Sequence, residues 1–144
     1  MRVINIKRSD LDFVRGKGEG SYPNECCGFL VGRADEEGVK RVSRVLPVDN
    51  AREEEAQRNR FLIRPEDFIA TEKTARADGL DIIGFYHSHP DAEAQPSAFD
   101  LEHAWPWYSY LIVSVRDRKA GRAASWVLDH DRSGFMEEDI NIED

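Results

Sequence analysis

The sequence predicts an α+β fold, in which a curved mixed β-sheet, or a sandwich built around it, is flanked by two or three helices. Six or seven short segments are rich in β-branched and aromatic residues, which suit strands. Two or three segments carry helix start and stop signals, and they do not alternate regularly with the strands. With 144 residues, of which 40% are hydrophobic and 33% charged, we expect a single domain over residues 1–144 with a buried core.

Composition argues against several classes of protein. No apolar run approaches the roughly 20 residues of a membrane helix, and the N-terminus lacks the apolar segment of a signal peptide. We therefore expect no membrane association and a cytoplasmic location. The formal net charge of -8 argues against non-specific nucleic-acid binding, which depends on neutralised phosphates. Cys26 and Cys27 are adjacent, which strains a disulfide between them, so we expect reduced, partly buried thiols.

The first elements are predicted to be a short strand and a helix. Residues 3–6 carry the alternating apolar pattern of a strand. A helix is predicted to begin at Leu11, with Ser9 or Asp10 as its N-cap. The glycines between positions 16 and 20 predict that its second half is frayed or in a loop.

A β-hairpin is predicted next. Residues 26–32 form an apolar run and residues 39–48 alternate apolar with charged side chains, so we expect an antiparallel pair joined by a loop over residues 32–38. The charge run over residues 49–60 is predicted to be solvated and mobile. Residues 61–63 are predicted to form a brief strand.

The second helix has clear boundary signals. Pro65 suits the first helical turn, the helix is predicted to run to about Ala77, and Gly79 suits the C-terminal cap. Its inner face is predicted to contain Phe68 and Ile69, with Glu72 and Ala75 as further candidates.

A buried strand follows over residues 80–86 and leads into His87 and His89 before Pro90 stops it. Beyond a polar loop, a helix is predicted to begin at Ser97. The remaining segments are predicted to be a helix over 97–104, strands over 108–115 and 122–128, and a terminal edge strand over 135–142. Three aromatic residues after the helix, Trp105, Trp107 and Tyr108, are predicted to be part of the core rather than a substrate platform.

His87 and His89 are the first candidates for a metal site. Alternate strand residues share a face, so the two imidazoles project the same way, roughly 6.7 Å apart along the backbone. Ser97 is a predicted N-cap and Asp100 lies on the first turn, where the loop can bring its carboxylate to the histidines. Two imidazoles and one carboxylate would leave the fourth position of a tetrahedral zinc ion for water. Taken separately, a His-X-His is usually structural and a Ser-X-X-Asp usually just a cap.

Together these residues resemble the zinc-binding signature of the JAMM (MPN-plus) metalloprotease family. The matching pattern is His87-Ser-His89-Pro, with seven residues between His89 and Ser97 and two residues between Ser97 and Asp100. Upstream, Pro23-Asn-Glu25-Cys-Cys-Gly before an apolar run is similar to the Pro-x-Glu-x-Cys-Gly of that family. The resemblance runs from about Val3 into the final third of the chain.

The resemblance implies a fold like that of cytidine deaminases and a bound Zn²⁺ held by His87, His89 and Asp100. It implies that Glu25 is the general acid/base, although position alone would not distinguish Glu25 from other acidic residues. By the same resemblance, Ser97 supports the oxyanion.

The family resemblance also implies a reaction and a partner. Small prokaryotic members cleave the amide bond at the C-terminus of a ubiquitin-like or sulfur-carrier protein with a Gly-Gly end, for instance releasing an attached amino acid. We expect the extended tail of such a carrier to pair with a sheet edge near the metal. The enzyme is expected to be a monomer or a homodimer.

The same residues suggest three other interpretations. A non-catalytic scaffold of the MPN type remains an alternative, although every expected ligand is present. A metallo-β-lactamase motif fails because Ala92 stands where a histidine is needed, and a deaminase lacks its Cys-X-X-Cys. His103 lies three residues beyond Asp100 on the same helix face, where contact with a ligand is the alternative, but we expect a packed or solvent-facing ring. His130 lies in a charged, turn-like stretch and is not a candidate.

Overall fold

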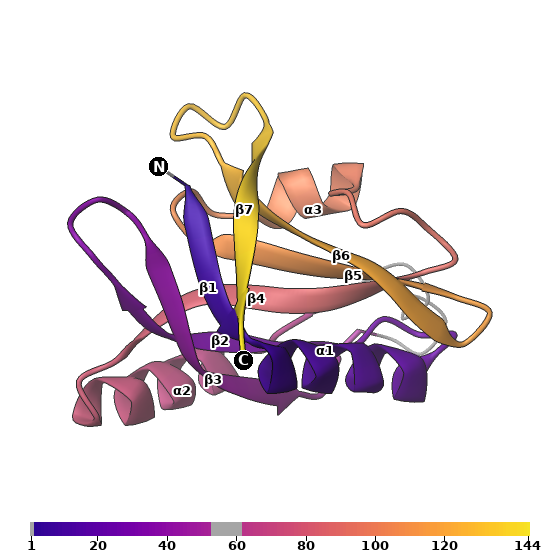
Figure 1. Cartoon of the computed structure of the whole chain (residues 1–144), viewed down its shortest axis with the longest axis horizontal. Helices are drawn as coiled ribbons and strands as arrows, with labels where there is room; N and C mark the ends of the chain where they lie inside the picture. The colour runs from indigo at the N-terminus through magenta and orange to yellow at the C-terminus, as the bar shows by residue number, and fades with distance from the viewer. Residues whose placement is uncertain (1, 53–61) are drawn as a thin grey trace.

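The computed structural model describes residues 2–52 and 62–144. Over these residues the chain forms three helices and seven strands, and the strands close into a barrel (Figure 1). The order of neighbouring strands around the barrel is β1-β3-β2-β4-β5-β6-β7. The elements are β1 (Val3–Lys7), α1 (Arg8–Ser21), β2 (Cys27–Ala34), β3 (Lys40–Val48), α2 (Pro65–Ala77), β4 (Asp81–Pro90), α3 (Ala98–His103), β5 (Ser109–Arg116), β6 (Lys119–Leu128) and β7 (Phe135–Glu143).

The sheet is mixed, as the sequence predicts, but it has no edge at its C-terminal strand. β1 runs parallel to both β3 and β7, and β4 runs parallel to β5, whereas the remaining neighbours are antiparallel. The prediction of a terminal edge strand is therefore wrong, because β7 pairs with β6 on one side and with β1 on the other. Pairing the first and last strands satisfies backbone groups that an open sheet would leave exposed.

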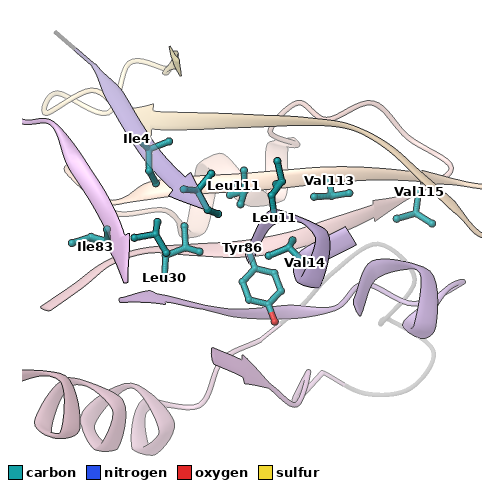
Figure 2. Packing of buried hydrophobic residues seen from close by; sticks show 11 residues of the cluster. Ile4, Leu11, Val14, Leu30, Ile83, Tyr86, Leu111, Val113 and Val115 are labelled. Atoms are coloured by element: carbon teal, nitrogen blue, oxygen red, sulfur yellow. The ribbon is translucent and has the colours of Figure 1, made fainter. Parts of the chain in front are cut away.

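The hydrophobic core joins the barrel to α1. Leu11 and Val14 of α1 are 1% and 0% exposed, and they pack in one cluster with residues of β1, β2, β4 and β5. Figure 2 shows Leu11 near Leu111 and Val113, and Val14 beside Tyr86, within this cluster. A second cluster of aromatic and aliphatic side chains includes Ala75 and Phe68 of α2. These two contacts fix both helices against the strand that carries the histidines.

Helix α1 is longer than the sequence predicts. It begins at Arg8 without a side-chain cap, so neither Ser9 nor Asp10 is the N-cap, and it continues through the glycines to Ser21. Gly18 lies so close to the sheet that a Cβ there would be 3.0 Å from Val115 Cγ2 and 3.3 Å from Ser88 Cβ. Close packing at Gly18 therefore outweighs its low helix propensity.

Helix α2 has the predicted bounds, with Pro65 in its first turn. Its end is a Schellman motif, in which Gly79 at φ +73° donates to the carbonyl of Arg76 and Leu80 donates to that of Ala75. The prediction that Ile69 faces inward is wrong, since its side chain is 65% exposed. Ile69 is rotated about 100° around the helix from Phe68, away from the buried face that Phe68 shares with Ala75.

Two other predictions differ from the structure. Leu62 and Ile63 do not form a strand, and Phe61 and most of the charge run lie outside the described residues. Trp105 and Trp107 are 66% and 42% exposed, so the prediction that they belong to the core is wrong. They lie in the connection between α3 and β5, which runs over the surface.

None of the helices in the described part of the chain has the length and apolar character needed to span a membrane.

Lys40 is a buried charged residue outside the group formed by the histidines. Lys40 begins β3 and is 3% exposed, and its Nζ donates to the Trp107 carbonyl and, at 2.9 Å, to Ser109 Oγ. Its ammonium also lies 4.8 Å from the centre of the Trp107 ring. Burial lowers the pKa of Lys40 to about 8, although the charge of Glu138 opposes this.

This shift predicts a stability that rises with pH. Between pH 8 and about 10.4 the unfolded chain holds the Lys40 proton and the folded protein does not. The free energy of unfolding therefore gains up to about 3 kcal/mol from this residue across that window. We expect the unfolding free energy of the wild type, minus that of Lys40→Met, to rise by this amount in urea titrations from pH 7.5 to 10.5. A constant difference across that range would contradict the prediction.

Candidate metal centre

The two histidines come from the end of β4, which lies between β2 and β5. His87 is 0% exposed and His89 is 6% exposed, and their side chains lie on the same face of the strand. Their Nε2 atoms are 3.1 Å apart. The end of β4 therefore brings two ring nitrogen atoms to one point, with both residues paired to β5.

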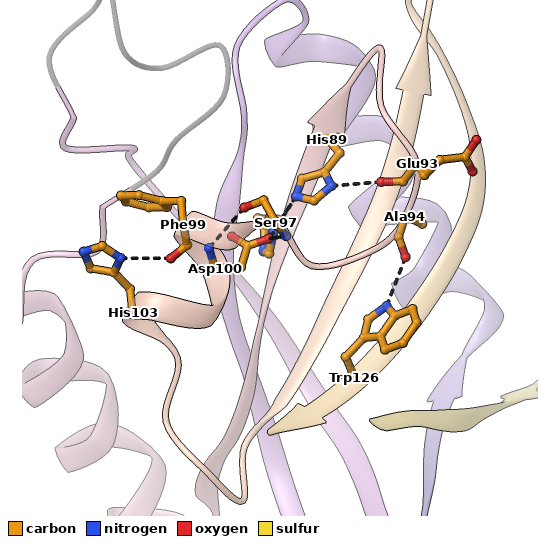
Figure 3. A network of polar contacts seen from close by, with 9 residues as sticks. His89, Glu93, Ala94, Ser97, Phe99, Asp100, His103 and Trp126 are labelled. Carbon is orange, nitrogen blue, oxygen red and sulfur yellow. Dashed lines mark hydrogen bonds and ion pairs between the residues drawn. The ribbon is translucent and has the colours of Figure 1, made fainter. Parts of the chain in front are cut away.

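Helix α3 supplies the carboxylate through its N-terminal cap (Figure 3). Ser97 Oγ accepts from the Asp100 amide at 3.1 Å, and Asp100 Oδ2 accepts from the Ser97 amide at 2.9 Å, which is a capping box. The same Oδ2 lies 3.3 Å from His87 Nε2 and 3.2 Å from His89 Nε2. The sequence predicts both the cap and the approach of Asp100, and the structure brings all four residues together.

The spacing of the three atoms fits a zinc ion. Ligands at 2.0–2.1 Å from a tetrahedral ion are about 3.3–3.4 Å from one another. The three observed separations, 3.1, 3.2 and 3.3 Å, match one face of such a tetrahedron. The chemistry also fits, because zinc binds imidazole nitrogen and carboxylate oxygen.

The loop after β4 fixes the orientation of His89. Its Nδ1 is 2.9 Å from the Glu93 carbonyl, which leaves Nε2 to face Asp100. The neighbouring carbonyl of Ala94 accepts from Trp126 Nε1 at 3.0 Å, so the loop is tied to β6 (Figure 3). Such hydrogen bonds behind a ligand orient it and raise its affinity for metal.

Burial and neighbouring charges determine the protonation states of these residues. Burial lowers the pKa of His87 despite the nearby Asp100, which favours a neutral ring with a lone pair for a metal. Burial also disfavours the protonated form of His89, but the hydrogen bond to Asp100 and the charge of Asp100 outweigh this and raise the pKa of His89. Burial would raise the pKa of Asp100, but His87 and then His89 and the Ser97 amide lower it well below its usual range. Asp100 is therefore ionised at neutral pH.

Glu25 reaches the same centre from the loop before β2. It is 5% exposed, and a carboxylate oxygen lies within 4.8 Å of ring nitrogens of His87 and His89. Its Oε1 is buried and has no hydrogen-bond partner among the described residues. Burial raises its pKa to about 8, and Asp100 adds to this while His89 opposes it. A carboxylate with a raised pKa beside a metal centre is suited to proton transfer.

Residues near the centre are placed largely as predicted. Ser97 is exposed, and its hydroxyl accepts from the Asp100 amide and keeps its own proton for donation. His103 is exposed, its ring stacks on Phe99 at 4.1 Å, and its Nδ1 is bonded to the Phe99 carbonyl. Cys26 and Cys27 are free thiols, as predicted.

Beside Asp100 lies a cavity of about 630 Å³, which we call the apolar pocket. Its walls come from α2, α3 and the connection that follows α3, with further residues from β4, β5 and the chain before α2. The sequence did not predict it, because its aromatic residues were assigned to the core. The residues lining it are Arg52, Leu62, Ile63, Pro65, Phe68, Ile69, Phe85, Phe99, Asp100, His103, Ala104, Trp105, Pro106, Tyr108 and Tyr110.

Comparison with known families identifies the chain. Residues 9–129 match the family model described as prokaryotic homologs of the JAB domain. The chain belongs to this family. The match contains both the Glu25 segment and the motif from His87 to Asp100, so the JAB assignment covers every residue of the centre.

Two curated relatives are similar over nearly their whole length. A desampylase from Haloferax volcanii is 37% identical over 131 residues, covering 90% of this chain and 89% of the relative. A CysO-cysteine peptidase from Mycobacterium tuberculosis is 32% identical over 142 residues, covering 97% and 91%. A solved JAB1/MPN domain protein from Archaeoglobus fulgidus matches with a TM-score of 0.58 at 18% identity, over 98% of this chain and 97% of that one, which confirms the predicted fold.

Proposed function

We propose that this JAB-domain protein is a zinc-dependent isopeptidase or peptidase. Its substrate is the amide bond at the C-terminus of a small ubiquitin-like or sulfur-carrier protein with a Gly-Gly end, for example one that carries an attached amino acid. The observation that carries the proposal is the set of three ligand atoms 3.1–3.3 Å apart with a buried carboxylate beside them. Similarity to a desampylase and to a CysO-cysteine peptidase supports the substrate class.

Each residue of the centre has a proposed role. His87, His89 and Asp100 would hold Zn²⁺, which when bound acidifies water to a pKa near 7 and polarises a carbonyl group. Glu25 takes the proton of the attacking water and delivers it to the leaving nitrogen. The Ser97 hydroxyl donates toward the carbonyl oxygen as negative charge develops there.

The binding mode of the carrier tail is a separate proposal. The sequence predicts pairing with a sheet edge near the metal, and β4 is paired with β2 only as far as His87, whereas its pairing with β5 continues to Pro90. Edge pairing therefore stays a prediction. We propose in addition that apolar residues of the tail enter the apolar pocket, whose lining includes Asp100.

The proposed function is tested by incubating the purified protein with two kinds of carrier conjugate. In one the carrier C-terminus bears an amino acid, and in the other it is joined to a lysine side chain by an isopeptide bond. We expect release of the attached group, loss of activity with a chelator, and recovery when zinc is added back. Stoichiometric zinc with no cleavage of any conjugate would overturn the enzyme assignment. Absence of both zinc and cleavage would favour the non-catalytic scaffold. We place the reaction in the cytoplasm, where free thiols such as Cys26 and Cys27 persist.

The tail-binding proposal predicts a selective effect at Ile69. Its side chain is 65% exposed at the pocket wall, so Ile69→Asp should fold normally. Loss of apolar contact, worth roughly 1.5–3 kcal/mol for a buried isoleucine, should raise KM for the conjugate at least about tenfold with little change in kcat. Steady-state kinetics measure both constants. The control is Ile142→Asp on β7, whose exposed side chain lies outside the pocket, and an equal rise in KM for both variants would contradict the proposal.

A further inference from the structure

The backbone around Glu25 is held by hydrogen bonds to its neighbours, whereas one oxygen of its carboxylate is not. Glu25 lies between α1 and β2, outside regular structure. Its Oε1 has no hydrogen-bond partner within the described residues. Its carbonyl accepts from Asn50 Nδ2 at 3.2 Å. The position of the carboxylate therefore depends on how firmly the segment from Tyr22 to Cys26 is attached to the barrel.

Ser88, between the two histidines, provides one attachment. Strand alternation turns its side chain to the face opposite the imidazoles, where it is 1% exposed. Ser88 Oγ accepts from the Cys26 amide at 2.9 Å, and the Ser88 amide donates to the Cys26 carbonyl at 3.2 Å. Two hydrogen bonds thus join the residue after Glu25 to the residue between the predicted ligands.

Helix α1 leaves Ser88 little room to move. A Cβ on Gly18 would be 3.3 Å from Ser88 Cβ and 3.9 Å from Ser88 Oγ, so the helix backbone packs directly behind the hydroxyl. This contact gives Gly18 a role beyond helix packing, because a larger residue there would displace Ser88.

A second attachment lies on the other side of Glu25. Tyr22 OH donates to Asp91 Oδ2 at 2.6 Å, and Asp91 follows His89 by two residues. Asp91 has φ +54°, and its amide donates to the Val115 carbonyl at 2.7 Å. The end of β4 is therefore bonded to the Glu25 segment both before and after Glu25.

We infer that Ser88 and the Tyr22–Asp91 pair are positioning residues that fix the distance between the Glu25 carboxylate and the two histidines. The inference rests on the proposed function, in which Glu25 transfers protons. One strand then carries the imidazoles on one face and the anchor of the proton-transfer residue on the other. A shift of β4 would move all of them together and preserve their geometry.

The test uses Ser88→Ala and Tyr22→Phe, with Ser125→Ala as the matched control. Ser125 is another fully buried serine, but its hydroxyl donates to Glu138 at 2.6 Å and not to the Glu25 segment. A displacement of about 1 Å in a reacting group can cost about a hundredfold in rate. We expect kcat to fall about ten- to a hundredfold in Ser88→Ala and about threefold in Tyr22→Phe. KM and zinc affinity should stay within about twofold in both variants, and Ser125→Ala should keep kcat at comparable thermal stability.

A second measurement does not depend on turnover. Amide exchange of Cys26, followed by NMR, should accelerate at least about tenfold in Ser88→Ala, while the amides at the centre of β4 keep their wild-type rates. Unchanged kcat in an active enzyme would overturn the inference, as would an equal loss of kcat in Ser125→Ala. If the wild type cleaves no conjugate, the proposed function fails. In that case unchanged Cys26 exchange would overturn the anchoring role as well.

Discussion

Glu25→Gln should lower kcat about 10²- to 10⁴-fold while the protein retains its zinc, because glutamine keeps the size of the side chain but cannot accept the water proton. The carboxylate is buried beside the histidines, and its raised pKa reflects that burial. Steady-state kinetics and metal analysis on the same preparation measure both quantities. Glu102→Gln, an exposed glutamate on α3, is the control and should retain wild-type kcat.

The pH profile gives an independent check on Glu25. A general base acts when ionised, so kcat/KM should rise as pH increases through the pKa of Glu25. That pKa is about 8 without metal, and a bound cation would lower it, so the midpoint should lie below 8. Glu25→Gln should lose this rising limb. A wild-type profile that is flat between pH 5 and 8 would contradict the assignment.

Local sequence signals predicted how His87, His89 and Asp100 lie relative to one another. Strand alternation places His87 and His89 on one face, and capping chemistry places Asp100 against Ser97, so each step acts within a few residues. Glu25 is different, because its position beside the two histidines depends on contacts between α1, β2 and β4. Only a family resemblance could select it from the many acidic residues.

Features that depend on contacts between residues far apart in the sequence were not predicted, for the same reason. The three glycines of α1 predict fraying, but the contact of Gly18 with Ser88 and Val115 is not visible in local propensity. Trp105 and Ile69 have apolar side chains that a sequence assigns to a core, yet both line an open pocket. The alternation that places the histidines also turns Ser88 the other way, and this was the available signal for its anchoring role.

Asp100→Asn should separate two functions of one atom. Asp100 Oδ2 accepts from the Ser97 amide and also faces both Nε2 atoms. Asparagine can still accept at the helix cap, so the fold should persist, but its neutral oxygen is a poor ligand. Loss of a residue behind a ligand costs about 10- to 100-fold in metal affinity, so loss of the ligand charge itself should cost at least about a hundredfold. Competition with a chromophoric chelator measures this affinity.

Ser97→Ala is the matched variant, since it removes the other half of the same capping box. We expect it to lose about 1 kcal/mol of stability and about 10²- to 10³-fold in kcat while binding zinc normally.

The geometry also permits a different ligand set, because Glu25 lies within 4.8 Å of both histidines. If Glu25→Gln loses zinc and Asp100→Asn keeps it, Glu25 is the metal ligand in place of Asp100, which is the reverse of the proposed roles. If Asp100→Asn loses zinc and Glu25→Gln keeps it, Asp100 is the ligand and Glu25 is left to move the proton.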